Sequence, residues 1–427
     1  MTDSRYEPTL KFRRSGEAGT GHCADLYFDS ASIGLESLCA RDAATQSTPE
    51  WEKALDAVKE RCGVLFGTQF GKDQVMLFHN TTAGVQRVLS RLQHIIGHET
   101  LTLLTTDIEY PGIIAAVDEN WQGRAVIAQV SQLVWDGKPQ CVEPALRKAF
   151  MLTEPDVVYL SHIARATGFE VPVHNFLAFA KELNPRLVVI VDGAQAAGNI
   201  QVEPHLVNEV DFYVTSGHKW LGGRTTLGIV ASSPEWRLSD PSQSYSRKSG
   251  SAGTGIAEAL RSLLKALEEF VDPAGGEEPK ARQERIANHN KRLAQRFVEL
   301  LTEKFSTLKP VIEEPSNGIV TIPDVPDGII NTLWNKGFRF SRLRTEPWRT
   351  EEGGDAPGKR NRFFVTVGPD SDDVSIQEVR FRETGVGPPF PRAGALRLCF
   401  HLYHRDDDVQ KLVEAVLGTS GGKAAAS

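Results

Sequence analysis

The sequence predicts an α/β fold, with a large domain built on a mostly parallel sheet flanked by helices and a smaller C-terminal α+β domain. Strand-like and helix-like segments alternate along most of the chain. Several strand-like segments, such as LVVIV at 187–191, are apolar throughout, which is typical of strands that are covered on both faces. The length of 427 residues suits two or three domains, and one large domain with one small domain is the simplest arrangement.

The large domain is expected over residues 46–280. It begins with a helix at 51–67, where apolar residues recur at helical spacing, and the same spacing returns at 82–96 and 174–184. Short apolar runs predict the strands, which we place at 74–80, 101–107, 156–163, 187–192, 211–216 and 227–233.

Two helices lead out of the large domain. An amphipathic helix is predicted at 256–271, and a second helix at 281–301 follows the helix-breaking segment PAGGEEPK. The second helix is expected to bridge to a small domain at 281–420, which would contain a strand at 395–403 and a final helix in DDDVQKLVEAVLG.

Three further segments complete the predicted organisation. Residues 1–45 are expected to join the small domain. Glycine, proline and charged residues dominate 345–394, which we interpret as an insertion or a long functional loop. The tail 421–427 is predicted to be disordered.

Composition limits the functional classes. A net charge of −7 and a pI near 5.9 do not favour general nucleic-acid binding. No apolar run approaches the ~18 residues of a membrane span, and no signal-peptide pattern opens the sequence. The five cysteines are scattered, with no CxxC pair, which argues against a disulfide framework or a zinc site. We therefore expect a cytoplasmic protein with free thiols and without metal, nucleic acid or membrane as partners.

Polar residues stand at the ends of predicted strands, where parallel α/β sheets bind their ligands. Asp192 ends the strand at 187–192, and an ionised carboxylate there needs a partner. Gln195 follows by one helical turn and could face the same ligand. Taken alone, Asp192 could equally cap the next helix.

A lysine directly follows the strand at 211–216, although lysine is rarely buried. An ammonium disfavoured near an apolar strand end can become a nucleophilic amine, so Lys219 is a candidate nucleophile. Ser216 and His218 beside it offer donors that suit a phosphate. The alternative for Lys219 is a solvated loop lysine.

Thr81 and Thr82 follow a third strand at the start of a helix. Their hydroxyls and the N–H groups of the helix could bind an anion, or the threonines could simply cap the helix. Together, the three strand ends suit a ligand with a phosphate, a ring nitrogen, a phenolic oxygen and an aldehyde. Pyridoxal 5'-phosphate carries all four groups.

Two motifs, D-G-A-Q at 192–195 and S-x-H-K at 216–219, resemble those of the class V aminotransferases. This family of fold type I enzymes includes cysteine desulfurases and isopenicillin N epimerase-like proteins. The resemblance extends from about Asp29 to about Leu417 and implies the PLP-transferase fold type I with pyridoxal phosphate as cofactor.

The resemblance also implies roles for the residues in the two motifs. Lys219 would form the internal aldimine, Asp192 would bind the protonated ring nitrogen, and Gln195 would face the ring hydroxyl. The phosphate would be held by Thr81, Thr82, Ser216 and His218.

Other positions match the family more loosely. Tyr110, in DIEYPG, falls where the family stacks an aromatic residue or histidine on the ring, although it could be an ordinary turn tyrosine. His162 matches a position near the ring hydroxyl. Ser251 and Thr254 lie in a segment that, in the family's dimers, reaches the neighbour's cofactor phosphate. The resemblance therefore implies a homodimer with shared active sites.

Two arginines are candidate substrate ligands. Arg397 matches the family's arginine strand and would bind the α-carboxylate of the substrate, for which the guanidinium geometry is suited. The alternative is an arginine paired with a structural carboxylate. Arg344 precedes the 345–394 segment and could bind a second anionic group, or it could be a solvated surface residue.

The implied function is that of an enzyme acting at Cα of an amino acid through an external aldimine and a quinonoid. Side-chain elimination or replacement, epimerisation and decarboxylation are all compatible with these residues. A true aminotransferase would use the same set, and a non-catalytic protein that keeps only the fold is a third alternative. A cysteine desulfurase is not expected, because no cysteine occurs between Cys141 and Cys399, and Cys399 lies in the arginine strand.

Overall fold

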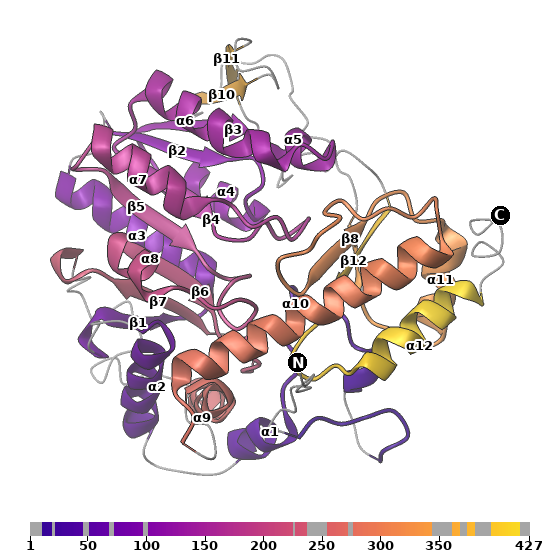
Figure 1. Cartoon of the computed structure of the whole chain (residues 1–427). Coiled ribbons are helices and arrows are strands. Elements are labelled where there is room, and N and C mark those ends of the chain that lie inside the picture. Colours follow the sequence, from indigo (N-terminus) through magenta and orange to yellow (C-terminus); the bar gives the residue numbers. More distant parts are fainter. Residues whose placement is uncertain are drawn as a thin grey trace.

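The computed structural model describes most of the two predicted domains (Figure 1). The described residues are 11–18, 22–45, 51–67, 72–96, 101–224, 227–236, 254–271, 276–343, 361–367, 374–380 and 394–418. Several predicted features lie outside them, namely Ser251, Arg344, the side chain of Thr254, the tail 421–427 and most of the 345–394 segment.

A nine-stranded sheet forms the centre of the large domain, in the order β1-β7-β6-β5-β4-β2-β3-β10-β11. The neighbouring strands from β6 to β10 run parallel, whereas β7 is antiparallel to both of its neighbours and β11 is antiparallel to β10. The strands are β1 (Val75–Phe78), β2 (Thr102–Thr106), β3 (Arg124–Gln129), β4 (Val157–Ser161), β5 (Val188–Asp192), β6 (Phe212–Ser216), β7 (Gly228–Ser232), β10 (Asn361–Val367) and β11 (Val374–Arg380).

Helices cover both faces of this sheet, which confirms the α/β class predicted from the apolar strands. Apolar residues of α3 and α4 pack on one face, while those of α2, α6, α7 and α9 pack on the other. The helices of this domain are α2 (Trp51–Leu65), α3 (Thr81–Ile96), α4 (Pro111–Asn120), α5 (Ser131–Trp135), α6 (Val142–Thr153), α7 (Val173–Leu183), α8 (Pro204–Glu209) and α9 (Thr254–Val271), with short 3₁₀ helices at Lys72–Gln74, Pro139–Cys141 and Pro234–Trp236.

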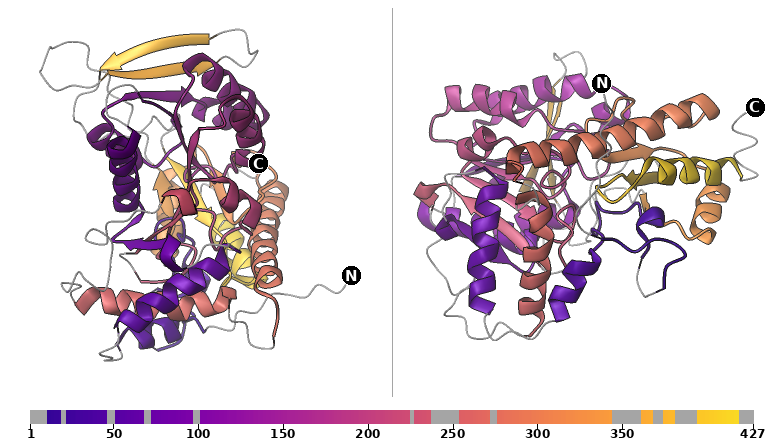
Figure 2. Two further views of the ribbon diagram at one scale, coloured as in Figure 1. Left: turned by 90° about the vertical axis from the view of Figure 1, so that its left-hand side faces the viewer. Right: turned by 60° about the horizontal axis from the view of Figure 1, so that its bottom comes forward.

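Strands β10 and β11 differ from the sequence prediction, which gave the 345–394 segment no regular structure. Both strands lie inside that segment, and they extend the large sheet beyond β3 as an antiparallel pair at its edge (Figures 1 and 2). Their sequences, NRFFVTV and VSIQEVR, are rich in β-branched and aromatic residues, which favour strands. The glycine, proline and charge around them obscured this pattern.

A second, three-stranded antiparallel sheet forms the small domain, in the order β8-β12-β9. It consists of β8 (Ile319–Ile322), β9 (Ser341–Leu343) and β12 (Ala395–Cys399), and it packs with α10 (Pro279–Lys304), α11 (Asp327–Asn335) and α12 (Asp406–Leu417) around its own apolar core. The long helix α10 runs from beside α9 across to the small domain (Figure 1), as expected for the predicted bridge.

The N-terminal segment contributes to both domains. Phe28, close after the 3₁₀ helix at Ala24–Leu26, belongs to the small-domain core, and Tyr27 forms a β-bridge with Arg339. Helix α1 (Leu38–Thr45) instead lies against α9 of the large domain. Among the described residues, no helix combines the length and apolar character needed to cross a membrane.

A buried ion pair joins α9 to α10, and its removal provides a test of the packing between these helices. Glu269 is fully buried and bonds to Arg282, which is 4% exposed. Glu269→Ala removes the buried carboxylate that bonds to the guanidinium, while the backbone carbonyl of residue 269 and the more distant Glu277, at 3.7 Å, remain. We expect a loss of about 3–5 kcal/mol in the free energy of unfolding, measured by urea denaturation.

The matched control for this variant lies on α10, the helix that carries Arg282. Arg296 and Glu299 form an exposed pair at 3.1 Å, so Glu299→Ala should cost about 0–1 kcal/mol. Equal losses in the two variants would show that burial of the Glu269–Arg282 pair does not determine its contribution.

Candidate active site

The predicted site residues meet at one edge of the large sheet because the strands that carry them run in the same direction. β4, β5 and β6 are parallel neighbours, so their carboxyl ends lie side by side. β1 is separated from β6 by the antiparallel β7 and therefore ends at the same edge. The residues that follow these four strands are thus brought together, as expected for a ligand site in an α/β sheet.

Asp192 is the last residue of β5 and is almost completely buried. One carboxylate oxygen accepts a hydrogen bond from the Tyr159 hydroxyl at 2.7 Å, and the other accepts one from the backbone N–H of Ala194 at 2.8 Å. Burial raises the pKa of Asp192, and the positive charge of Lys219 opposes this shift. The carboxylate is thus held rigidly, with a cation nearby.

Lys219 lies just beyond β6 and is partly buried. Its Nζ atom lies 5.8 Å from the centre of the Tyr110 ring. The pKa of Lys219 is lowered to about 8, chiefly by burial and also by the positive charges of Arg165 and Arg397, while the negative charge of Asp192 opposes the shift. A substantial fraction of this lysine is therefore an uncharged amine at moderately alkaline pH, as a nucleophile requires.

Close packing explains the glycine of the D-G-A-Q motif. A Cβ atom at position 193 would lie 2.1 Å from the hydroxyl oxygen of Tyr213. That hydroxyl is 3.2 Å from Nδ1 of His162, and the His162 backbone N–H donates to the carbonyl of Asp192. Burial lowers the pKa of His162 to about 4, so the ring is neutral at pH 7. His162 thus supports the turn after Asp192.

Gln195 makes two contacts that the sequence did not suggest. Its side-chain N–H donates to the carbonyl of Ala31 at 2.9 Å, and its side-chain oxygen accepts from the Trp220 indole at 2.8 Å. The ring of His401 stacks on Trp220 and contacts the Trp220 carbonyl at 2.7 Å. Gln195 therefore ties the turn after β5 to the neighbour of Lys219 and to the N-terminal segment, and its predicted contact with a ring hydroxyl remains a prediction.

Ser216 and His218 form a local pair at the end of β6. The Ser216 hydroxyl lies 3.0 Å from Nδ1 of His218. The pKa of His218 is lowered to about 4, chiefly by burial and also by the positive charge of Lys219. Both groups are neutral hydrogen-bonding partners beside the lysine, which is compatible with the predicted phosphate contact.

The N-terminus of α3 is capped by a residue that the sequence analysis did not select. The side-chain oxygen of Asn80 accepts from the N–H of Ala83 at 2.8 Å, so Asn80 is the capping residue. The Thr81 hydroxyl donates to the carbonyl of Thr215 on β6 at 3.0 Å. The threonines are therefore not the caps, and the first N–H groups of α3 have no acceptor within the helix. These N–H groups and Thr82 remain candidates for holding an anion.

Tyr110 precedes α4 and is 42% exposed. Its ring lies over Gly112, where an added Cβ atom would approach the ring to 2.6 Å. The ring also faces two cations, because Arg165 lies 5.3 Å and Lys219 lies 5.8 Å from its centre. The predicted stacking residue is therefore an accessible aromatic ring beside the candidate nucleophile.

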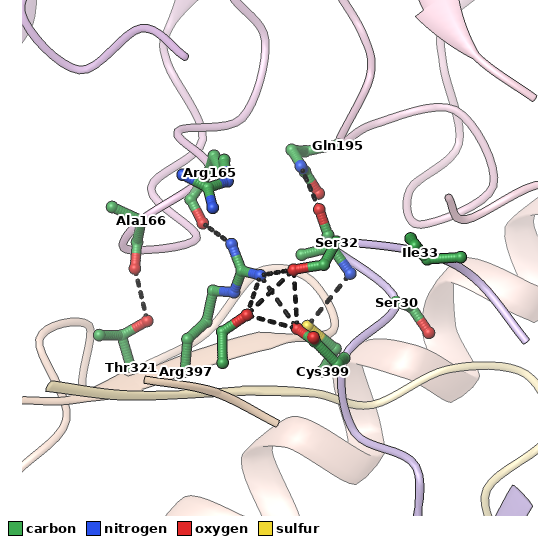
Figure 3. Close-up of polar contacts among 12 residues, drawn as sticks. Ser30, Ser32, Ile33, Arg165, Ala166, Gln195, Thr321, Arg397 and Cys399 are labelled. Atoms are coloured by element: carbon green, nitrogen blue, oxygen red, sulfur yellow. Dashed lines mark hydrogen bonds and ion pairs between the residues drawn. The ribbon is translucent and has the colours of Figure 1, made fainter. Parts of the chain in front are cut away.

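Arg397 is fully buried on β12, within the polar cluster of Figure 3. One terminal nitrogen contacts Asp29 at 3.1 Å, Ser32 at 2.7 Å and Ser341 at 2.7 Å. The other terminal nitrogen donates to the carbonyl of Arg165 at 3.1 Å. These contacts match the alternative of an arginine paired with a structural carboxylate, and its predicted binding of the α-carboxylate stays a prediction.

Three residues near the site were missed by the sequence analysis. Tyr159 bonds to Asp192, and Arg165 faces Tyr110. Glu109 is buried, accepts hydrogen bonds from Ser161 and Thr106, and has its pKa raised to about 7 by burial. Glu109 lies next to Tyr110 in DIEYPG, and Arg165 lies in LSHIARATG, the segment that contains His162. Their proximity in the sequence to selected residues could therefore have identified them.

The described residues fit pyridoxal phosphate. A buried carboxylate and an amine with a lowered pKa come from neighbouring strand ends, an exposed aromatic ring lies beside the amine, and neutral donors lie near the N-terminus of α3. This donor set matches the ring nitrogen, the aldehyde, the ring face and the phosphate of the cofactor.

Comparisons with known proteins concern the family and the fold. The sequence model of the family described as Aminotransferase class-V matches residues 30–238. No curated protein matches the sequence. A structure of a C-DES mutant with glycine covalently linked to its PLP cofactor has 17% identity and a TM-score of 0.65, covering 92% of this chain and 97% of the other.

Two further structures show the same likeness. The apo cysteine desulfurase from Thermococcus onnurineus NA1 has 15% identity and a TM-score of 0.63, with 96% of this chain and 99% of the other covered. The serine palmitoyltransferase from Sphingomonas wittichii has 12% identity and a TM-score of 0.63, with 93% and 87% covered. At these identities the likeness concerns the fold. The chain therefore carries a class V aminotransferase domain within the fold of the type I pyridoxal phosphate enzymes.

Proposed function

We propose that this enzyme binds pyridoxal phosphate through Lys219 and acts at Cα of an amino acid, in a lyase-like, epimerase-like or side-chain replacement reaction. The observation that carries the proposal is the position of Lys219 and the buried Asp192 at the ends of neighbouring parallel strands, where the charge of each shifts the pKa of the other. An amine and a carboxylate in this arrangement match the aldehyde and the ring nitrogen of the cofactor. When bound, the cofactor supplies an electron sink that stabilises negative charge at Cα.

Each residue of the proposed site has a task set by its chemistry. Asp192 would hold the proton on the pyridine nitrogen through its negative charge, and Tyr159 and the Ala194 N–H orient its carboxylate for this contact. Lys219 removes or returns the proton at Cα of the substrate, for which its lowered pKa is suited. The Tyr110 ring limits the tilt of the cofactor.

Binding of the phosphate is assigned to the neutral donors at the ends of β1 and β6. Ser216 and His218 lie beside Lys219, and Thr82 and the N–H groups of α3 supply the helix end. We also propose a homodimer in which Ser251 and Thr254 of one subunit reach the phosphate of the other.

We propose that the reaction is not persulfide-forming desulfuration. The sequence has no cysteine between Cys141 and Cys399, so the small-domain segments before β12 offer no thiol. Cys399 itself is fully buried, its Sγ accepts from the Ala31 N–H, and burial raises the pKa of its thiol to about 12. A buried and protonated thiol is a poor nucleophile.

The type of reaction can be tested with a panel of amino acids added to the cofactor-loaded protein. We expect ammonia with an oxo acid such as pyruvate, or solvent deuterium at Cα of the recovered amino acid. A true aminotransferase would instead convert the cofactor to pyridoxamine phosphate with an equal amount of oxo acid. Alanine together with protein-bound persulfide from cysteine would contradict the assignment against desulfuration.

Covalent attachment of the cofactor tests the central residue. Lys219→Ala should abolish the visible absorption band of lysine-bound pyridoxal phosphate, because no other amine follows β6 at the site. Lys309→Ala removes an exposed lysine of the small domain and should leave the band unchanged. An unchanged band in Lys219→Ala would mean that another residue holds the cofactor.

The lowered pKa of Lys219 predicts how cofactor capture depends on pH. Only the neutral amine attacks an aldehyde, and its fraction falls about tenfold for each pH unit below the pKa. The rate constant for binding of pyridoxal phosphate to the cofactor-free protein should therefore rise up to about pH 8 and then level off. Stopped-flow absorbance measures this rate. A continued rise toward about pH 10 would indicate an ordinary lysine pKa instead.

A further inference from the structure

Glu109 is a buried acid that has no part in the proposed catalytic steps. It lies in the turn between β2 and α4, directly before Tyr110, and is 2% exposed. Its Oε1 atom accepts hydrogen bonds from the Thr106 hydroxyl at 2.6 Å and from the Ser161 backbone N–H at 3.1 Å, and its Oε2 atom accepts from the Ser161 hydroxyl. Thr106 ends β2 and Ser161 ends the neighbouring β4, so Glu109 joins two strand ends to the residue before Tyr110.

The hydrogen bonds of Glu109 persist whether or not it carries a charge. The pKa of Glu109 is raised to about 7, chiefly by burial and also by the negative charge of Asp192, while the hydrogen bonds from Ser161 and Thr106 oppose the shift. The side chain is therefore not a permanent anion at neutral pH. The Ser161 hydroxyl is able to donate to the ionised form or to accept from the protonated form. Glu109 is thus a link between strand ends in both states.

The Tyr110 ring takes its position largely from the backbone. The ring is 42% exposed, so few side chains enclose it. The Tyr110 carbonyl accepts hydrogen bonds from the N–H groups of Ile113 and Ile114, which begin α4. The backbone of Tyr110 is therefore anchored by α4 on one side and by Glu109 on the other.

Gly112 leaves the space that the ring occupies. A Cβ atom at position 112 would lie 2.6 Å from the Tyr110 ring and 3.5 Å from the Thr82 hydroxyl oxygen. The first distance is well below the ~3.5–4.0 Å of a favourable carbon contact, so the ring would have to move. Gly112 lies in the first turn of α4, where alanine has the higher helix propensity. Glycine at this position therefore serves the ring and not the helix.

We propose that Glu109 and Gly112 are positioning residues that hold the Tyr110 ring over the cofactor site. Glu109 fixes the backbone before the tyrosine, and Gly112 leaves room for its ring. This inference rests on the proposed function, because the ring is the group that limits the tilt of the cofactor. In the resulting position the ring centre lies 5.8 Å from Nζ of Lys219, where a cofactor held by that amine would meet it.

Asp107 provides a matched control, since it is a second buried carboxylate in the same turn. It accepts hydrogen bonds from the backbone N–H groups of Val130 and Ser131, both at 2.8 Å, and from the Ser131 hydroxyl at 2.6 Å. Asp107 is thus bonded to residues that follow β3, on the other side of β2 from β4. Replacing either acid removes buried hydrogen bonds, but only Glu109 adjoins Tyr110.

Visible circular dichroism of the cofactor-loaded protein provides the test, because an achiral chromophore acquires this signal from a fixed and asymmetric environment. Tyr110→Ala should lose most of the signal per bound cofactor, and this loss sets the scale. Glu109→Ala and Gly112→Ala should each reproduce most of it, whereas Asp107→Ala should keep the wild-type signal. Glu109→Gln should also keep the signal, because its amide group is able to bond to both strand ends.

Two measurements on the cofactor-free protein separate positioning from a loss of folding. Urea denaturation of Gly112→Ala should give a midpoint equal to or above that of the wild type, so its lost signal would not come from unfolding. Hydrogen exchange of the peptide that contains Ser161 should be faster in Glu109→Ala and unchanged in Glu109→Gln. If Glu109→Ala does not fold, Ser161→Ala replaces it, and its removal of one hydroxyl contact should give a smaller loss of the same signal.

A wild-type signal in either Glu109→Ala or Gly112→Ala would overturn the inference, and so would an unchanged signal in Tyr110→Ala. An equal loss in Glu109→Gln and Glu109→Ala would overturn it as well, since it would mean that the charge of Glu109 matters rather than its hydrogen bonds. Failure of the wild-type protein to bind pyridoxal phosphate would instead overturn the proposed function, while the exchange at Ser161 would still test the anchor that Glu109 provides.

Discussion

The buried carboxylate of Asp192 is the constraint on which the site depends. A charge in a nearly water-free position is costly unless hydrogen bonds and an opposite charge stabilise it. Here Tyr159 comes from β4, the Ala194 N–H from the turn after β5, and the positive charge of Lys219 from beyond β6. Three neighbouring parallel strands must therefore keep their register for one side chain to be satisfied. The same register places a reactive amine beside a fixed anion.

A second requirement is that the small domain holds the loops of the large one. Arg397 and Thr321 bond to consecutive backbone carbonyls after β4, while His401 stacks on Trp220 next to Lys219. Gln195 joins that tryptophan to the N-terminal segment. The site is thus assembled where the two domains meet, a common location for ligand sites. A change in the small-domain sheet would move groups on both sides of Lys219.

Burial divides the arginines of this region into two kinds. Arg397 is fully enclosed and forms an ion pair with Asp29. Arg165 keeps part of its surface accessible and lies beside the exposed Tyr110 ring. Residue type alone could not separate these two environments, because both arginines are suited to a carboxylate.

The sequence by itself determined the fold class and the cofactor, and it selected Asp192 and Lys219 as the central candidates. Apolar strands alternating with helices define a covered parallel sheet, and D-G-A-Q with S-x-H-K placed a carboxylate and a lysine at adjacent strand ends. A local sequence pattern can predict a strand and the motif that follows it, because the two are contiguous in the chain. The cap of α3 is also a local feature, but the sequence did not identify it. The hydrogen bond from the Ala83 N–H shows that Asn80, rather than Thr81, is the capping residue.

Only the tertiary structure decided which polar side chains are already occupied. Gln195 bonds to Ala31, 164 positions away, and Arg397 bonds to Asp29, 368 positions away, so no local pattern reports these contacts. Strand β10 was hidden for a similar reason, because its partner β3 is far off in the chain, and β11 in turn pairs with β10. Burial and long-range pairing are properties of the folded chain, and they separate the residues that support this site from those that face its ligand.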